Sequence, residues 1–510
     1  MNAPRSRGPL AGQLAGPLAG QLAGLLIGAW LVAALALLVT RALYDQFDSD
    51  EFQHGHIAWL MANGQPPYQL LYRDFWEHHG PLFALANGWL LKLSGAAPGL
   101  DLLFACRLGS VLATAGIGAL TYATARLLSV SRLASLGSVA LLLSLLFVQD
   151  KGAECRPDTW QNLLWLAGFA LTLLNLRRRS PWLAVLAGLL LGLAVLSNLK
   201  AALGPLCIAL YFVFGGRLHR LPPAAVVREL ALLGAGGTVA VAAVAGWFAS
   251  QGALEALWHF NVTWNLIAAR GETGNGRGLG YLGLMLRHQA PFLLAVAAGV
   301  WFAGRLPRAG GGLLLVVAAG TGLGWALNNY TQYFLIFLPL WSVLGAFGVS
   351  ELLRVLEERG GTVPRRAGSA ALLAGIALLG WTAVRFTPLA EHPNLTVQKS
   401  LAALLLRATA RDEPIGVIWD YCGGFVFNPP VQYYWAAEPS IGRAVVLDTR
   451  WNPTAVNPFG QPWIDALEAQ QVRFIVGRES DLFRGLPAET QAYVRGHYRN
   501  NGCLWKRMAP

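Results

Sequence analysis

Charged residues are scarce in this chain of 510 residues: Asp, Glu, Lys and Arg together make up 13% of it, against 55% hydrophobic residues. Ordinary soluble domains carry about 25% charged residues. A chain with half that share cannot cover a water-facing surface, so most of its residues must face lipid or other helices. The composition excludes an ordinary soluble domain and predicts a polytopic membrane protein.

Cysteine is also sparse, with five residues in all. They stand at positions 106, 155, 207, 422 and 503, and no two have the Cys-x-x-Cys spacing. This spacing argues against a zinc or redox cassette. Cys422 and Cys503 both lie in the C-terminal segment, where a disulfide between them is an open alternative.

Acidic residues are outnumbered, and the formal net charge is +12. Such an excess can indicate nucleic-acid binding, so we asked where the basic residues lie. Apolar runs of roughly 17–25 residues are long enough to cross a bilayer. These runs predict a bundle of about 11 transmembrane helices. The runs are 22–42, 103–125, 133–149, 159–176, 181–197, 200–215, 229–250, 281–304, 311–327, 333–350 and 369–387.

The loops on one side of these runs are short and basic. They include Arg126, Arg132, Arg177, Arg178, Arg179, Arg305, Arg308 and Arg354. Cytoplasmic loops of membrane proteins carry this excess of Lys and Arg, so the N-terminus is predicted to be cytoplasmic. The positive charge is therefore a signal of topology, and no nucleic-acid partner is needed to explain it.

The longer segments fall on the opposite, outer side. They are residues 43–102, 150–158, 251–280 and all that follows 388. Within the first, the apolar stretch PLFALANGWLLKL at 81–93 is too short to span comfortably and predicts a helix along the outer leaflet. The chain is thus predicted to consist of a membrane domain, 1–388, and an outer domain, 389–510.

The outer C-terminal domain is predicted to be a small α/β unit, because short strand-like and helix-like segments alternate along it. Four segments have the strand pattern, namely 414–421, 443–448, 472–477 and 503–508. Two segments, 461–471 and 486–496, have the pattern of helices.

Titratable side chains gather at the outer ends of the predicted spans. The main candidates are Asp50, Glu51, Glu77, His78, His79, Arg156, Asp158, Lys200 and Arg270, with Tyr330 and Gln332 nearby. Acids and bases at one depth indicate a reaction at the membrane interface. A carboxylate could accept a proton from a hydroxyl, and fixed cations could stabilise a phosphate leaving group.

Each candidate also has an ordinary structural explanation. Asp50 and Glu51 could cap a helix, since acids favour that end of the dipole. Lys200 could extend to the interface from the end of a span, and Arg156 and Asp158 could form a plain surface ion pair. Arg270 could simply occupy a Gly-rich loop, and Tyr330 and Gln332 could belong to an interfacial belt.

The histidines raise the further alternative of a divalent metal ion. Together with His54 and His56, the Glu-His-His stretch at 77–79 supplies ligand types that such an ion accepts. The spacing matches no standard site. No cofactor is therefore predicted outright.

The order of these motifs resembles that of a known family. One span is followed by Asp50–Glu51, then by NGQPPY…YRDFWEHHGPL, then by RLGSVLATAGIGALTYATARLL. This order is similar to that of the protein O-mannosyltransferase and aminoarabinose-transferase superfamily, polytopic glycosyltransferases with the GT-C fold. The resemblance covers residues 20–350 and is most specific in the first outer loop.

The resemblance implies roles for individual residues. Asp50 falls on the catalytic aspartate, which deprotonates or orients the acceptor, and Glu51 on its usual partner. Asp158 matches an acidic position of the next outer loop, and Lys200 the cation expected near the lipid phosphate.

The second family motif contains Glu77 and His79. Here the chain has EHHGP where many members have Glu-Lys-Pro-Pro, and Gln332 stands where some have histidine. The C-terminal domain is similar to the variable outer domain of bacterial members. The resemblance therefore implies a bacterial plasma (inner) membrane protein with a periplasmic or extracellular C-terminal domain.

We therefore predict a membrane glycosyltransferase that acts on the outer face. It would move a sugar from a polyprenyl-phosphate donor to a hydroxyl of a lipid, glycan or protein acceptor, with inversion and with Asp50 as base. The alternative is a transporter or flippase for a lipid-linked glycan. Transporters tend to place ionisable groups near the midplane and to contain repeated halves, and the sequence shows neither pattern.

Overall fold

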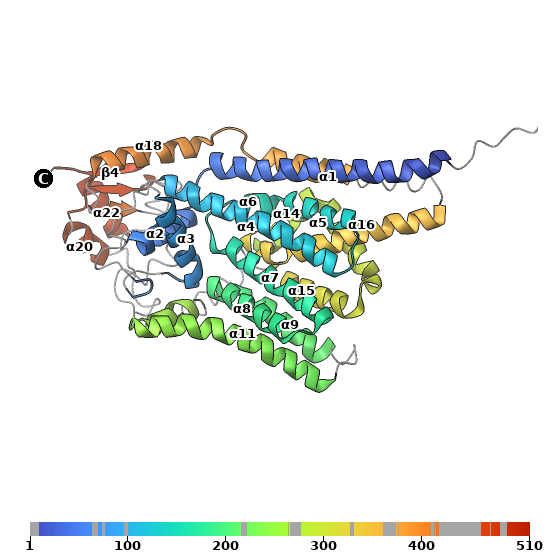
Figure 1. The fold of residues 1–510 in the computed structure, drawn as a ribbon. Helices are drawn as coiled ribbons and strands as arrows, with labels where there is room; N and C mark the ends of the chain where they lie inside the picture. The colour runs from blue at the N-terminus through green and yellow to red at the C-terminus, as the bar shows by residue number, and fades with distance from the viewer. Residues whose placement is uncertain are drawn as a thin grey trace, which may run out of the picture.

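The fold is that of a computed structural model of the whole chain. It describes residues 10–63, 70–73, 77–95, 100–215, 222–263, 265, 277–326, 331–360, 374–375, 377–409, 413, 415–417, 461–469, 471–479 and 487–509. The protein is mainly helical. A small sheet stands at one end of a bundle of long apolar helices (Figure 1).

The bundle consists of long helices that run alongside one another, with α1 and α11 on opposite sides (Figure 1). They are α1 (Leu10–Tyr44), α4 (Leu100–Leu127), α5 (Arg132–Leu143), α7 (Pro157–Arg178), α8 (Pro181–Ser197), α9 (Leu203–Leu210), α11 (Pro223–Ser250), α14 (Arg277–Phe302), α15 (Arg308–Ala326) and α16 (Leu338–Gly360). Within the described residues, five helices are long and apolar enough to cross a membrane, and several shorter apolar helices accompany them. The chain is thus a polytopic membrane protein, and the count of about 11 spans stays a prediction.

Two predicted spans are not single helices. The run 133–149 is broken into α5 and α6 (Leu146–Lys151). At the break, Trp30 donates a hydrogen bond to the Ser144 hydroxyl at 2.7 Å, and the Gln149 amide donates to the Leu143 carbonyl at 2.6 Å. The run 200–215 consists of the 3-10 turn η1 (Leu199–Ala202), α9 and the π turn η2 (Tyr211–Gly215). Hydropathy reports apolar length but not the continuity of the backbone, so the apolar runs located these two segments but not the changes of helix type and the break within them.

The first outer loop contains two helices. The expected helix at 81–93 is confirmed as α3 (Pro81–Ser94), whereas α2 (Ser49–Asn63) was not predicted. Every residue from 51 to 60 is buried, because α2 packs on α3 and α4 and lies over an apolar cluster. A helix that is buried on all sides has no polar face, and so its sequence shows no helical period.

The C-terminal sheet has the order β1-β2-β4-β3. Strand β1 (Ile415–Val417) pairs parallel with β2 (Phe474–Val476), while β2 with β4 (Leu504–Arg507) and β4 with β3 (Tyr498–Asn501) pair antiparallel. The strands predicted at 472–477 and 503–508 are confirmed as β2 and β4, and the helices predicted at 461–471 and 486–496 as α20 (Gln461–Ala469) and α22 (Ala488–His497). Strand β1 lies within the strand predicted at 414–421, of which residues 418–421 lie outside the described residues. The strand predicted at 443–448 lies outside the described residues, and β3 was missed.

Helix α18 (Pro393–Ala408) was also missed, and it connects the sheet to the bundle. Leu401 and Leu405 pack against β2 and β4. Leu395 and Ala402 belong to the apolar cluster under α2. The sheet, α18, α2 and α3 therefore lie together at one end of the molecule (Figure 1).

Candidate active site

The first turn of α2 holds the Asp50–Glu51 pair. The Asp48 carboxylate accepts a hydrogen bond from the Asp50 backbone N–H at 3.1 Å, and the Glu51 carboxylate accepts one from the Asp48 N–H at 3.0 Å. Reciprocal bonds of this kind form a capping box. Asp48 and Glu51 therefore cap α2, whereas Asp50 contributes only its backbone N–H and its carboxylate stays available at the end of the bundle.

The carboxylate of Glu51 is wholly buried. Arg107 of α4 donates two hydrogen bonds to it, at 2.7 and 2.6 Å, and the Cys155 backbone N–H donates a third at 2.8 Å. The same guanidinium also lies over the Phe47 ring at 4.1 Å. This carboxylate fixes α2 against α4 and the segment before α7, and its geometry is that of a positioning residue rather than of a group that reaches substrate.

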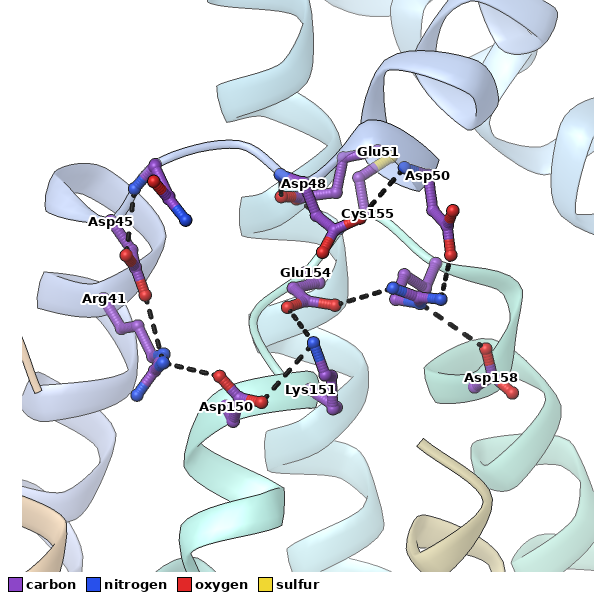
Figure 2. Close-up of polar contacts among 12 residues, drawn as sticks. Arg41, Asp45, Asp48, Asp50, Glu51, Asp150, Lys151, Glu154, Cys155 and Asp158 are labelled. Carbon is purple, nitrogen blue, oxygen red and sulfur yellow. Dashed lines mark hydrogen bonds and ion pairs between the residues drawn. The ribbon is translucent and has the colours of Figure 1, made fainter. Parts of the chain in front are cut away.

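A single arginine lies among three carboxylates. Arg156, which precedes α7, bonds to Asp50 and to Glu154 (3.1 Å), and its Nε lies 3.9 Å from Asp158 Oδ2 (Figure 2). Burial alone would lower the pKa of Arg156, but Asp50 and Glu154 hold that pKa well above its usual value. The side chain of Asp50 is 30% exposed and that of Asp158 only 8%. Of these two aspartates, Asp50 is the one that a substrate can reach.

The ion pairs continue from this arginine to α1 (Figure 2). Glu154 pairs with Lys151 at 2.6 Å, Lys151 with Asp150 at 3.4 Å, and Asp150 with Arg41 of α1 at 2.5 Å. Burial raises the pKa of Glu154 to about 7, although Lys151 and Arg156 act in the opposite direction. Glu154 is thus a carboxyl group that changes charge near neutral pH and that pairs with the same arginine as Asp50.

The cation Lys200 lies on the far side of Asp158. The Asn198 side chain links Asp158 to the backbone of Lys200. Its oxygen accepts a hydrogen bond from the Lys200 backbone N–H at 3.2 Å, and its amide donates one to Asp158 Oδ1 at 3.5 Å. The Lys200 ammonium bonds to the Tyr333 hydroxyl and lies 3.9 Å from the centre of that ring. Tyr333 belongs to the 3-10 turn η5 (Thr331–Ile336).

The Glu-His-His stretch at 77–79 leads into α3. Glu77 is buried. Its Oε1 accepts hydrogen bonds from the backbone N–H groups of His78 and His79, each at 2.8 Å, and lies 2.8 Å from the His79 Nδ1. Gly80 follows, and a Cβ there would come within 1.8 Å of the Leu196 carbonyl oxygen. Only glycine fits at this point, so the stretch is fixed against the end of α8.

Burial lowers the pKa of His78 and of His79, the histidines that follow Glu77. Burial alone would raise the pKa of Glu77, but the His79 and His54 rings hold it well below the usual value. His54, Glu77 and His79 offer ligand atoms that all lie within 4.8 Å of one another. This group could hold a divalent ion, whereas His56 is not part of it.

The structure brings most of the predicted residues together. Asp50 and Asp158 both contact Arg156, and Asn198 links Asp158 to the backbone of Lys200. His78 and His79 are close enough to Lys200 for its charge to lower the pKa of each. Gln332 lies half-buried in η5. Arg270 and Tyr330 lie outside the described residues.

Sequence reasoning missed the partners of these residues. Arg107, Glu154 and Asn198 were assigned no role, and Tyr333 was passed over in favour of Tyr330 and Gln332. A buried arginine inside an otherwise apolar helix was the available signal for Arg107, since such a charge needs a partner.

The chain is similar to known proteins in part of its sequence and in its fold. The family model described as dolichyl-phosphate-mannose-protein mannosyltransferase matches residues 78–247. ArnT from Cupriavidus metallidurans in the apo state superposes with a TM-score of 0.61 at 12% identity, over 95% of this chain and 98% of that one. No curated protein matches the chain by sequence.

Two further solved structures are similar. ArnT from the same organism bound to undecaprenyl phosphate gives a TM-score of 0.52 at 15% identity, over 80% of this chain and 84% of that one. The oligosaccharyltransferase AglB from Archaeoglobus fulgidus, in complex with an inhibitory peptide and a dolichol-phosphate, gives 0.54 at 15% identity, over 88% and 69%. The fold and the family match together indicate the class of protein, which is a membrane glycosyltransferase. In fold the chain is similar to ArnT and AglB, both GT-C glycosyltransferases, and the family match over residues 78–247 supports the superfamily that its motif order predicted.

Proposed function

We propose that the chain transfers a sugar from a polyprenyl-phosphate donor to an acceptor hydroxyl, with inversion at the anomeric carbon and with Asp50 as base. The observation that carries this proposal is the pairing of Asp50 with Arg156 beside Lys200: a reachable carboxylate stands next to fixed cations. The structures of similar fold include ArnT bound to undecaprenyl phosphate and AglB with a dolichol-phosphate and a peptide. The lipids bound to those two proteins support a lipid-linked donor.

In the proposed reaction, the acceptor oxygen attacks the anomeric carbon while its proton passes to the Asp50 carboxylate. The bond from that carbon to the phosphate oxygen breaks, and the phosphate takes the electron pair. Lys200 stabilises the charge that develops on the phosphate, most effectively where water is partly excluded. Arg156 orients Asp50, and Glu154 and Asp158 in turn hold Arg156.

The proposed site faces the outside of a bacterial plasma membrane, with the N-terminus cytoplasmic. Supporting this orientation, the basic loops lie together at the opposite end of the bundle: Arg177 donates to the Ser129 hydroxyl at 2.9 Å, and Gly310 lies against Leu128. The membrane domain would be residues 1–388 and the outer domain 389–510. A lipid donor brings its headgroup to this depth, which accounts for the titratable residues there.

The reaction is tested by Asp50→Asn in membranes supplied with radiolabelled polyprenyl-phosphate sugars. Because the amide cannot accept the proton, we expect transfer to fall about 100-fold or more, in the range typical for loss of a general base. The control is Asp101→Asn at the exposed start of α4, which should transfer at the normal rate. Unchanged transfer by Asp50→Asn would contradict the mechanism, and flipping of a lipid-linked glycan without transfer would favour the transporter.

A further inference from the structure

Two cysteines from separate elements lie side by side behind the site. Cys106 is on α4, and Cys155 is in the segment between α6 and α7 (residues 152–156, the α6–α7 segment). Both are buried, with exposed fractions of 2% and 0%, and both belong to the apolar cluster under α2. Burial raises the pKa of the Cys155 thiol, and the neighbouring Cys106 side chain raises it further. Along with Cys207 they are free cysteines.

The packing of the α6–α7 segment along α4 explains why the thiols meet. The Thr114 hydroxyl donates to the Gly152 carbonyl at 2.7 Å, and Ala153 shares an apolar cluster with Val111. The α6–α7 segment therefore follows α4 back from Thr114 toward Cys106.

The backbone at the thiols is held in place by a shared partner. The Cys155 N–H donates to the Glu51 carboxylate at 2.8 Å, and Arg107, the residue after Cys106, donates to the same carboxylate at 2.7 and 2.6 Å. Glu51 is wholly buried. The contact between the cysteines is thus part of a fixed structure rather than a meeting of two loose surfaces.

The same end of the molecule already contains a disulfide. Cys503, between β3 and β4, is disulfide-bonded, while Cys422 lies outside the described residues. The sheet stands beside α2 and the start of α4 (Figure 1). Disulfides form and persist in oxidising compartments outside the cytoplasm. A pair of thiols at this end of the molecule is therefore in a compartment where a disulfide can form.

We propose that Cys106 and Cys155 form a disulfide that joins α4 to the α6–α7 segment. This proposal rests on the outward orientation given with the proposed function. The two thiols lose two protons and two electrons, which pass to an oxidised dithiol carrier protein of the outer compartment. One thiolate attacks the disulfide of the carrier, and the second displaces the carrier as its dithiol. Since both thiols are buried in the folded protein, the exchange takes place before the segment packs on α4.

The bond would fix the two arginines that organise the site. Arg107 follows Cys106 and holds Glu51, and Arg156 follows Cys155 and holds Asp50. A disulfide between Cys106 and Cys155 would fix the distance between the backbones from which the two arginine side chains extend. Closure of a loop of about 50 residues also restricts the unfolded chain, which stabilises the fold.

The bond is tested on the full chain by differential alkylation. Cells are lysed directly into denaturant that contains excess N-ethylmaleimide, so that buried free thiols are alkylated as well, and the protein is then purified, reduced and labelled with the isotopically heavy reagent. Peptide mass spectrometry should find the heavy label on Cys106 and Cys155 and the light label on Cys207. The light label on Cys106 and Cys155 would overturn the proposal.

Variants give a second measurement. In Cys155→Ser, the label on Cys106 should change from heavy to light, whereas the matched control Cys207→Ser should leave Cys106 and Cys155 heavy. The midpoint of thermal unfolding should fall by about 5 °C in Cys106→Ser and in Cys155→Ser, with no further fall in the double variant. Additive losses would contradict a shared bond. Loss of transferase activity with the heavy labels in place would count against the proposed function and not against the disulfide.

Discussion

Arg156 is the residue through which the carboxylates of the site act on one another. Asp50, Glu154 and Asp158 all lie within ion-pair distance of its guanidinium. Without it, three neighbouring carboxylates would repel, and at least one would take up a proton. Arginine suits this position because its planar fork offers five donors and stays charged. The arginine thus orients Asp50 before any substrate arrives.

Glu154 makes this arrangement sensitive to pH. Burial raises the pKa of its carboxyl to about 7, so it is neutral below that pH and negative above it. The negative form shares the charge of Arg156 and weakens the hold of Arg156 on Asp50, which leaves Asp50 freer to accept a proton. We expect the transfer rate to rise between pH 6 and 8, with a midpoint of about 7.

The variant Glu154→Gln tests this dependence, because glutamine resembles the protonated form at every pH. Its transfer rate, measured across the same range in the same membranes, should stay flat near the low-pH value of the unaltered protein. A rise with its midpoint still near pH 7 would assign the titration to another group.

At the scale of elements, one buried ion pair joins three helices. Glu51 opens α2, Arg107 lies in α4, and the same guanidinium donates to the backbone carbonyls of Ala42 at 3.1 Å and Asp45 at 2.8 Å, at the end of α1. Loss of one partner would leave the other charged and buried, which typically costs about 3–5 kcal/mol. Replacement of both by apolar residues of similar size costs much less.

A double-mutant cycle measures this coupling. We expect Glu51→Leu and Arg107→Leu each to lower the thermal midpoint of the purified protein strongly, and the double variant to lower it by less than the sum. The pair Glu351→Leu and Arg305→Leu, which is partly exposed at the opposite end of the bundle, serves as control and should show little coupling. Additive losses at Glu51 and Arg107 would mean that the pair does not act as a unit.

Over the whole molecule, sequence patterns located elements but not their contacts. Apolar runs predicted the helices well, since a span must be long and uncharged, and clustered carboxylates indicated the end that holds the candidate site. The ion pair of Glu51 with Arg107 and the contact of Lys200 with Tyr333 join residues far apart in the chain. The hydrophobic periodicity of a single helix or strand cannot predict such long-range contacts. Helix α2 was not predicted because it is buried on every side, so its sequence shows no alternation of polar and apolar faces.

The C-terminal domain is connected to the site by α18, which suggests that the two parts of the chain act together. The Gln398 side chain accepts a hydrogen bond from the Phe47 N–H and donates one to the Phe47 carbonyl, each at 2.9 Å and buried. The His392 N–H donates to the Tyr44 carbonyl at 2.8 Å. Helix α18 thus holds the short link between α1 and α2, three residues before Asp50.

Substitution of Gln398 by alanine should therefore act on the site through the backbone. The change leaves the Phe47 N–H and carbonyl buried without their partner, and each such group costs about 1–3 kcal/mol. We expect Gln398→Ala to lower both the thermal midpoint and the transfer rate, whereas Arg407→Ala, on the exposed last turn of the same helix, should change neither. A transfer rate that is unchanged in Gln398→Ala while the midpoint falls would show that α18 serves the stability of the fold alone. A fall in both would show that the outer domain helps to position the catalytic aspartate.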